Sequence, residues 1–353
     1  MTTHSDTTTA TDAMATTPLL SLRNIVKDYV VATDWRGRPK KTVSALADVS
    51  LDVHHAETVA VVGESGSGKS TLGRIAVDLV RATRGEALYE GQPAARQGRR
   101  GTLAFRKDFQ IVFQDPRSSL NARRRLTDIL GDPLVLHGVC DRNELRAQAG
   151  SVLESVGLAP GAMYLDRKPT QFSGGQLQRI AVARALSLDP KLVVADEPVS
   201  ALDASVRAQV LQLIRDRQQQ SGVSFLFITH DLAVARNIAH RIAVMYLGKL
   251  VEVGDVERII HAPAHPYTRA LLSATPLPDP RRERQRVRIA LSGEIPSAAN
   301  PPKGCRFSLR CPQAMPVCRE AEPASVPLTA QHHVACHLYT EGRSTSAGLS
   351  SAA

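Results

Sequence analysis

The sequence predicts an α/β fold in which a parallel or mixed sheet is covered by helices. Four short apolar runs lack polar alternation, which is typical of strands buried on both faces. Apolar residues at helical spacing separate these runs, as in residues 175–188 and 206–220. Alternating strands and helices are the pattern of α/β proteins. The four predicted strands are residues 58–62, 109–113, 192–195 and 224–229.

Length and composition indicate a folded chain with a basic surface. The 353 residues suit about two domains, and 43% apolar residues exclude a wholly disordered chain. The formal net charge of +10 suits a nucleic acid or an anionic membrane surface, and equally an Arg-rich protein with no special partner. No apolar run approaches the roughly 18 residues that span a bilayer, and the Thr-rich N-terminus lacks a secretory signal. We therefore expect a cytoplasmic protein whose contact with a membrane is peripheral.

Composition divides the chain further. Polar, low-complexity residues at 1–19 and 342–353 predict disordered tails. Residues 20–260 carry the α/β pattern, interrupted at about 115–172 by Leu-rich stretches that predict a helical insertion. Pro-rich sequence at 261–341 predicts a separate C-terminal module or an extended arm.

A phosphate-binding loop follows the first apolar run. Residues 63–70 read GESGSGKS, which fits G-x-x-x-x-G-K-[ST] between a strand and a helix. Glycines let several backbone N–H groups point at one anion, and the helix adds the positive end of its dipole. Lys69 would reach the β- and γ-phosphates, and the Ser70 hydroxyl would bind Mg²⁺. The loop residues expected to hold ATP are Gly63, Ser65, Gly66, Ser67, Gly68, Lys69, Ser70 and Thr71.

Two carboxylates end the third apolar run. We expect Asp196 to hold Mg²⁺ through water and Glu197 to polarise the water that attacks the γ-phosphate. An Asp-Glu pair after a strand is more often a helix cap or a solvated turn. The phosphate loop upstream is what favours the catalytic interpretation.

Further motifs, in a fixed order, resemble those of ATP-binding cassette (ABC) ATPases. Residues 172–176, FSGGQ, are similar to the family's signature motif, with Phe in place of the usual Leu. Gln114 in VFQDP resembles the Q-loop glutamine, and SALD at 200–203 resembles the D-loop. His230, after SFLFIT, resembles the switch histidine, and Tyr29 resembles the aromatic residue that stacks on adenine. The resemblance implies the ABC fold, an ABC-type P-loop ATPase with a helical subdomain and a small cysteine-containing C-terminal extension.

The same resemblance implies an ATP sandwich between two ATPase subunits. Glu197 would orient the attacking water, His230 would hold the γ-phosphate and Glu197 in place, and Gln114 would sense Mg²⁺. The residues that would cap the partner's γ-phosphate are Ser173, Gly174, Gly175, Gln176 and Asp203. The residues that would hold Mg²⁺ are Ser70, Gln114 and Asp196.

Longer segments resemble the oligopeptide/dipeptide importer group, and within it the F-type ATPase subunit. They include FQDPRSSLNAR, DEPVSALDASVRAQVLQLI, HPYTRALLSATPLPDP, GEIPSAANPPKGCRFSLRCP and HHVACH, and they cover about residues 20–340. The resemblance implies an ATPase on the cytoplasmic face of the membrane that drives peptide uptake. Its partners would be a homologous D-type ATPase, two permease subunits and an extracytoplasmic substrate-binding protein. Nickel importers belong to the same group, so the cargo stays open, as does the choice between hetero- and homodimer.

A nucleic-acid-associated ABC ATPase is the alternative from another functional class. The charge of +10 allows it. A single cassette and an aromatic content of only 4%, which is poor for base stacking, argue against it. We therefore expect no nucleic-acid partner.

Four of the five cysteines lie close to the C-terminus. Cys305, Cys311, Cys318 and Cys336 are separated by 5, 6 and 17 residues, which is not the C-x-x-C spacing of a zinc ribbon. Four thiolates can bind Zn²⁺ or a [4Fe–4S] cluster. The region resembles modules that hold [4Fe–4S], which favours the cluster, with Zn²⁺ or unligated thiols as alternatives. Cys140 is expected to be a buried, inert thiol.

Overall fold

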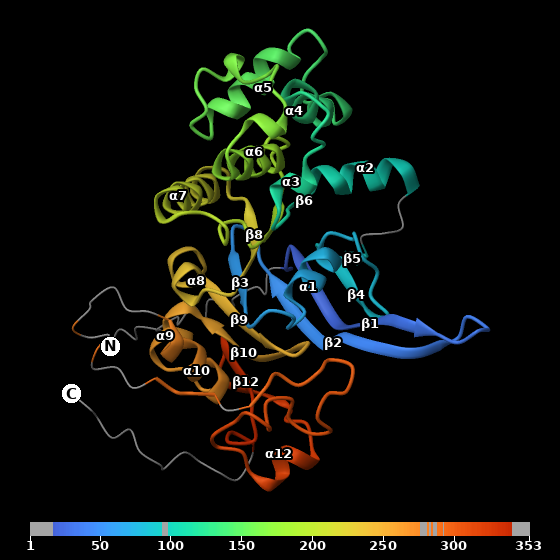
Figure 1. The fold of residues 1–353 in the computed structure, drawn as a ribbon, viewed down its shortest axis with the longest axis vertical. Coiled ribbons are helices and arrows are strands. Elements are labelled where there is room, and N and C mark those ends of the chain that lie inside the picture. The colour runs from blue at the N-terminus through green and yellow to red at the C-terminus, as the bar shows by residue number, and fades with distance from the viewer. Residues whose placement is uncertain are drawn as a thin grey trace, which may run out of the picture.

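The computed structural model describes residues 17–93, 98–275, 281, 284, 288–291 and 293–340. Two sheets lie at its centre, with a group of helices at one end and the C-terminal segment at the other (Figure 1). The C-terminal tail predicted from the sequence lies outside the described residues, as do positions 1–16 of the N-terminal tail. Leu19, assigned to that tail, is fully buried in the core.

The main sheet has eight strands in the order β11-β12-β10-β9-β3-β8-β7-β6. Pairing is parallel from β6 to β9 and antiparallel from β9 to β11. Strands β3, β7 and β8 are buried along their whole length, as their continuous apolar runs predict. The strands are β3 (Thr58–Val62), β6 (Phe109–Val112), β7 (Leu192–Asp196), β8 (Ser224–Thr229), β9 (Arg241–Tyr246), β10 (Lys249–Asp255), β11 (Ser325–Thr329) and β12 (His332–Ala335).

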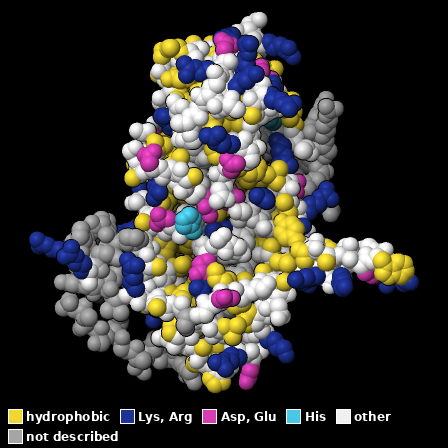
Figure 2. All heavy atoms as spheres, in the orientation of Figure 1, with side chains coloured by type: hydrophobic (Ala, Val, Ile, Leu, Met, Phe, Trp, Pro, Cys, Tyr) yellow, Lys and Arg dark blue, Asp and Glu magenta, His cyan; other side chains and the backbone are white. Residues whose placement is uncertain are grey.

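A second, antiparallel sheet has the order β2-β1-β4-β5. Its inward residues join β3, β7 and β8 in one apolar core. The far end of the β1–β2 hairpin projects from the body and carries hydrophobic and basic side chains, among them Trp35, which is 85% exposed (Figures 1 and 2). The strands are β1 (Leu20–Thr33), β2 (Pro39–Val53), β4 (Arg84–Tyr89) and β5 (Gln92–Pro93).

Helices cover the main sheet, and the predicted helical insertion packs against α6 around a shared apolar core. The insertion contains α3, α4, α5 and two short 3₁₀ turns, with no strand among its described residues. The helices are α1 (Lys69–Ala76), α2 (Gly98–Asp108), α3 (Pro116–Ser119), α4 (Leu126–Leu136), α5 (Leu145–Glu154), η2 (Gly161–Met163), η3 (Pro169–Gln171), α6 (Gly174–Leu186), α7 (Ala204–Ser221), α8 (Leu232–Ile238), α9 (Val256–His261), α10 (Pro266–Ala274) and α12 (Pro316–Glu320). No described helix is long and apolar enough to cross a bilayer.

The C-terminal segment is not the separate module or free arm that its composition suggests. Strand β12 pairs with β10 and so extends the main sheet. The buried Glu252 connects β10 to the start of α10 and to β12. Its carboxylate accepts hydrogen bonds from the backbone N–H groups of Ala264 (2.7 Å) and His265 (2.9 Å) and lies 2.8 Å from Nε2 of His332. Burial alone would raise the pKa of Glu252, but these hydrogen bonds hold it below its ordinary value.

Candidate functional site

The predicted catalytic groups meet at one edge of the main sheet. Strands β3, β6, β7 and β8 run parallel, so their carboxyl ends lie along the same edge. A cavity of about 470 Å³ opens there, between the phosphate loop and the ends of these strands. Its lining residues are Gly63, Glu64, Ser65, Gln114, Glu197, His230 and Leu271.

The phosphate loop depends on glycine at two positions. Gly63 and Gly68 have φ of 157° and 103°. A Cβ on Gly63 would lie 2.1 Å from the carbonyl oxygen of Met245, and one on Gly68 would lie 2.4 Å from that of Ala45. Any side chain at either position would therefore displace backbone and open the loop. Ser65 and Gly66, at the tip, are exposed.

Lys69 begins α1 and is folded back into the loop. Its Nζ donates hydrogen bonds of 2.8 Å to the carbonyl oxygens of Gly63 and Glu64. Burial lowers the pKa of Lys69, and the nearby carboxylates of Glu197 and Asp196 oppose that shift. The ammonium group therefore lies inside the loop, where a triphosphate would be bound.

Ser70 and Asp196 form an oxygen-rich pair next to the lysine. The Ser70 hydroxyl donates a 2.8 Å hydrogen bond to Oδ1 of Asp196, which is 2% exposed. Burial raises the pKa of Asp196. A hydroxyl and a carboxylate side by side are the hard oxygen ligands that Mg²⁺ prefers, so the donor set fits this ion.

Glu197 lies at the centre of the predicted catalytic groups. Its Oε2 accepts a 3.1 Å hydrogen bond from Nε2 of Gln114 and lies 3.3 Å from Nδ1 of His230. Glu197 has φ of 46°, the left-handed region, and its backbone N–H donates to the Ile228 carbonyl at 3.0 Å. The structure thus brings together the three residues to which the sequence assigns hydrolysis, and it anchors the carboxylate through backbone as well as side chains.

The signature motif begins α6 and the D-loop begins α7. Ser173 Oγ accepts from the backbone N–H of Gln176 at 3.3 Å, and the Gln176 side chain accepts from the N–H of Ser173 at 3.0 Å. These reciprocal bonds form a capping box. Asp203 likewise caps α7 by accepting from the N–H groups of Val206 (3.0 Å) and Ser205 (3.1 Å), and these bonds lower its pKa. In the single chain all three polar side chains serve as helix caps.

Tyr29 lies on β1, half-buried and paired with Val43 of β2. The Lys27 ammonium lies 5.0 Å from the centre of its ring. Tyr29 does not line the cavity at the ends of β3, β6, β7 and β8. Adenine stacking on this ring therefore stays a prediction.

The four C-terminal cysteines lie in one segment, and all five thiols of the chain are free. Within the described residues, no group of three or more Cys, His, Asp or Glu side chains is arranged to hold a metal ion. Burial, together with the other three cysteines of the segment, raises the pKa of Cys305 to about 11. Cys140 is buried, as predicted, and burial raises its pKa.

Sequence reasoning missed the residues that connect the phosphate loop to the C-terminal segment. Arg310 makes two hydrogen bonds to the Glu64 carboxylate, of 2.7 and 3.0 Å. The Tyr267 hydroxyl accepts from the backbone N–H of Glu64 at 2.9 Å. Neither residue belongs to a nucleotide-binding motif, and no local pattern could have placed them at the loop.

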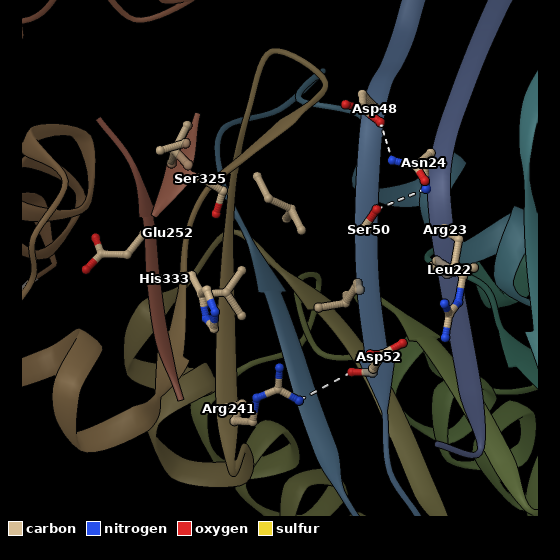
Figure 3. A pocket seen from close by; sticks show the side chains of 15 residues that line it. Leu22, Arg23, Asn24, Asp48, Ser50, Asp52, Arg241, Glu252, Ser325 and His333 are labelled. Carbon is tan, nitrogen blue, oxygen red and sulfur yellow. Dashed lines mark hydrogen bonds between the residues drawn. The ribbon is translucent and has the colours of Figure 1, made fainter. Parts of the chain in front are cut away.

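A further groove, of about 540 Å³, lies between the second sheet and the β9–β12 end of the main sheet. Figure 3 shows Arg23 and His333 on its opposite walls, with Arg241 hydrogen-bonded to the backbone of Asp52. The groove is larger than the cavity at the phosphate loop, but none of the predicted catalytic or ATP-binding residues lines it.

Comparison with known proteins agrees with these motifs. The ABC transporter family matches residues 46–200, and the oligopeptide/dipeptide transporter C-terminal region matches residues 251–318. The dipeptide transport ATP-binding protein DppF of Haemophilus influenzae is 48% identical over 87% of this chain and 92% of its own length. The oligopeptide transport ATP-binding protein OppF of Escherichia coli is 45% identical over 86% and 90%. The solved dimer of the ATP-binding cassette MJ0796, bound to ADP and Pi, is 29% identical, with a TM-score of 0.60 over 67% of this chain and 98% of that one.

The ABC ATPase fold, the grouped catalytic residues and these relatives lead to one assignment. The chain belongs to the ATP-hydrolysing subunits of ABC transporters, in the group that contains the oligopeptide and dipeptide transport ATP-binding proteins.

Proposed function

We propose that this chain is the energy-coupling subunit of an importer for di- or oligopeptides and works on the cytoplasmic face of the membrane. The observation that carries the proposal is the meeting of Lys69, Asp196, Glu197 and His230 at one strand edge. The peptide cargo is supported by the dipeptide and oligopeptide transport ATP-binding proteins, which are 48% and 45% identical to this chain.

The residues of the strand edge divide the work of hydrolysis between them. The phosphate loop binds the triphosphate through backbone N–H groups, and Lys69 leaves the loop carbonyls for the β- and γ-phosphates. Mg²⁺, held by Ser70 and Asp196, would neutralise charge on those phosphates when bound. Glu197 accepts the proton of the attacking water, while Gln114 and His230 fix the direction of its carboxylate.

A second ATPase subunit completes the site in this proposal. Ser173 and Gly174 are exposed at the start of α6, and a Cβ on Gly174 would meet nothing within 4 Å. Such an open helix N-terminus suits the γ-phosphate held by another subunit. We propose a homologous D-type ATPase as that subunit, with a homodimer as the alternative that chain counting in a purified complex would reveal.

The permease contact is proposed for the groove between the helical insertion and β6. This groove measures about 450 Å³ and is lined by residues of both parts, among them Gln110, Arg124 and Leu136. Leu136 is 64% exposed. Because β6 leads directly to Gln114, a permease segment in this groove would sense the state of the site.

A [4Fe–4S] cluster bound by Cys305, Cys311, Cys318 and Cys336 is the finer part of the proposal. It is supported by the donor set, four free thiols in one segment of the chain. Such a cluster would link the small apolar cluster that contains Cys336 to the larger one against which Cys305 and Cys311 pack, and so stabilise the segment. Iron and acid-labile sulfide in anaerobically purified protein would support it, whereas stoichiometric zinc without sulfide would refute it.

The test of the whole proposal is purification of the chain with its neighbours, followed by uptake measurements. We expect co-purification with two membrane permease subunits and ATP-dependent uptake of labelled di- or oligopeptides. Nickel uptake without peptide uptake would show that the cargo is nickel and that the peptide assignment is wrong. Co-purification with nucleic acid and no permease would refute the importer assignment.

A further inference from the structure

Glu64, the phosphate-loop residue after Gly63, forms an ion pair with Arg310 of the C-terminal segment. The Arg310 guanidinium donates bidentate hydrogen bonds to the Glu64 carboxylate, from Nη1 to Oε2 at 2.7 Å and from Nη2 to Oε1 at 3.0 Å. The Arg310 side chain is 9% exposed and that of Glu64 is 24% exposed. This pairing is the strong, geometrically specific form of an Arg–carboxylate contact.

The backbone of Glu64 is held by the same side of the chain. The Tyr267 hydroxyl, on α10, accepts from the Glu64 N–H at 2.9 Å. Tyr267 is fully buried and packs edge-on against Tyr246, with ring centres 4.7 Å apart. The Tyr246 hydroxyl in turn lies 3.4 Å from Nη1 of Arg310. Both the carboxylate and the N–H of Glu64 therefore have partners outside the loop.

A second contact reaches the loop at Ser67. The Ser67 carbonyl accepts from the N–H of Gly248 at 2.8 Å, in the turn between β9 and β10. Arg306 donates to the carbonyl of Leu247, the other residue of that turn. Arg306 and Arg310 come from one short segment, residues 305–311, which begins and ends with cysteine. This segment thus touches the loop directly at Glu64 and through one turn at Ser67.

We propose that Arg310 is a positioning residue for ATP binding, which acts by neutralising and orienting Glu64 within the phosphate loop. The inference rests on the proposed function, because it assigns a role at the same ATP site. Without Arg310, the Glu64 carboxylate would be an unpaired negative charge in a loop that must receive a triphosphate. It would also be free to attract Lys69, whose Nζ already bonds to the Glu64 carbonyl.

In this proposal Arg310 affects ATP binding only through its contact with Glu64, so the effect of replacing Arg310 should depend on whether the Glu64 carboxylate is present. The variants are Arg310→Met, which keeps the apolar stem, Arg310→Lys, which keeps the charge, Glu64→Gln, and the double variant Arg310→Met with Glu64→Gln. Arg319→Ala is the matched control, since Arg319 is an exposed arginine of the same C-terminal segment. The readouts are the Kd for a fluorescent ATP analogue, and KM and kcat for hydrolysis.

We expect Arg310→Met to raise Kd and KM about tenfold, which corresponds to about 1.4 kcal/mol, and to leave kcat within about twofold. Arg310→Lys should lie between this variant and the wild type. Glu64→Gln sets the reference Kd for a loop without this carboxylate, and in its background Arg310→Met should have no further effect. This loss of effect separates positioning through Glu64 from general damage, which would weaken ATP binding in either background.

Two results would overturn the proposal: a change in Kd below twofold in Arg310→Met, or a double variant that binds ATP about tenfold more weakly than Glu64→Gln alone. If Arg310→Met does not fold, Arg310→Lys provides the test, and a Kd of Arg310→Lys equal to that of Arg319→Ala would overturn the proposal. Lys69→Ala is measured alongside. If Lys69→Ala also binds ATP normally, the proposed function itself fails, whereas weak binding in that variant confines the failure to Arg310.

Discussion

Replacement of Glu197 by Gln is the sharpest test of the hydrolytic site. Glutamine has the size of glutamate and keeps an oxygen that can accept from Gln114, which lies 3.1 Å from Glu197 Oε2. The substitution removes the negative charge that takes a proton from water. A positioned general base contributes about 10²–10⁴ in rate, so hydrolysis should fall by that factor, or about 3–5 kcal/mol in activation free energy.

ATP binding should survive the same substitution. The phosphate loop and Lys69 do not depend on Glu197 for their backbone contacts. Loss of one carboxylate beside the triphosphate also reduces electrostatic repulsion. The assays are phosphate release, the Kd for a fluorescent ATP analogue, and size-exclusion chromatography with Mg-ATP, where a slowly hydrolysing protein should accumulate as a closed dimer. Glu257→Gln on α9, with a side chain 80% exposed, is the matched control.

Two results would refute this reasoning. Turnover near the wild-type rate would remove Glu197 from the role of base. Parallel losses of binding and turnover would show that Glu197 supports the phosphate loop and does not act on water.

The remaining predictions concern the signature motif and a buried histidine. Gly174→Ala should keep or slightly raise the midpoint of thermal unfolding, because its Cβ meets nothing within 4 Å. The same variant should abolish ATP-dependent dimerisation. Gly175→Ala should lower the midpoint of thermal unfolding, because its Cβ would lie 2.8 Å from Val206. A Gly174→Ala protein that still forms the ATP-dependent dimer would contradict the sandwich. Burial lowers the pKa of His265 from 6.5 to about 4, so between these pH values the unfolded chain binds a proton that the folded chain does not. The free energy of unfolding should therefore be highest above pH 6.5 and fall by about 3 kcal/mol as the pH drops toward 4. His265→Asn should flatten that loss in denaturant titrations at pH 7.5 and 5, and an unchanged pH dependence would exclude His265 as its source.

The sequence predicted the strands of the parallel core closely because their signal is local. Residues 58–62 and 224–229 coincide with β3 and β8, and 192–195 falls one residue short of β7. A strand buried on both faces is apolar at every position, and few other elements share that pattern. The predicted catalytic residues come directly after these strands in the sequence, so parallel pairing places them at one edge of the sheet.

The second sheet and the C-terminal hairpin carried no comparable signal. Strand β1 runs from buried residues at its start to exposed ones at its end, so its pattern is neither continuous nor cleanly alternating. The pairing of β12 with β10 joins residues about 80 positions apart, such as Glu252 and Val334. The contact between Glu64 and Arg310 spans 246 positions. Contacts of this kind depend on how finished elements pack, which composition and spacing do not encode.

The signature residues show why a helix cap and a partner contact are compatible. Ser173 Oγ accepts from the N–H of Gln176, and this leaves its own O–H proton free to donate. The N–H groups of Gly174 and Gly175 lie in the first turn of α6, where no intrahelical acceptor exists. The cap therefore fixes the shape of the turn while one hydroxyl and two backbone donors stay available. An anion from outside the chain is the partner that such a set of donors fits, which is why the capping bonds of the single chain support the ATP sandwich and do not compete with it.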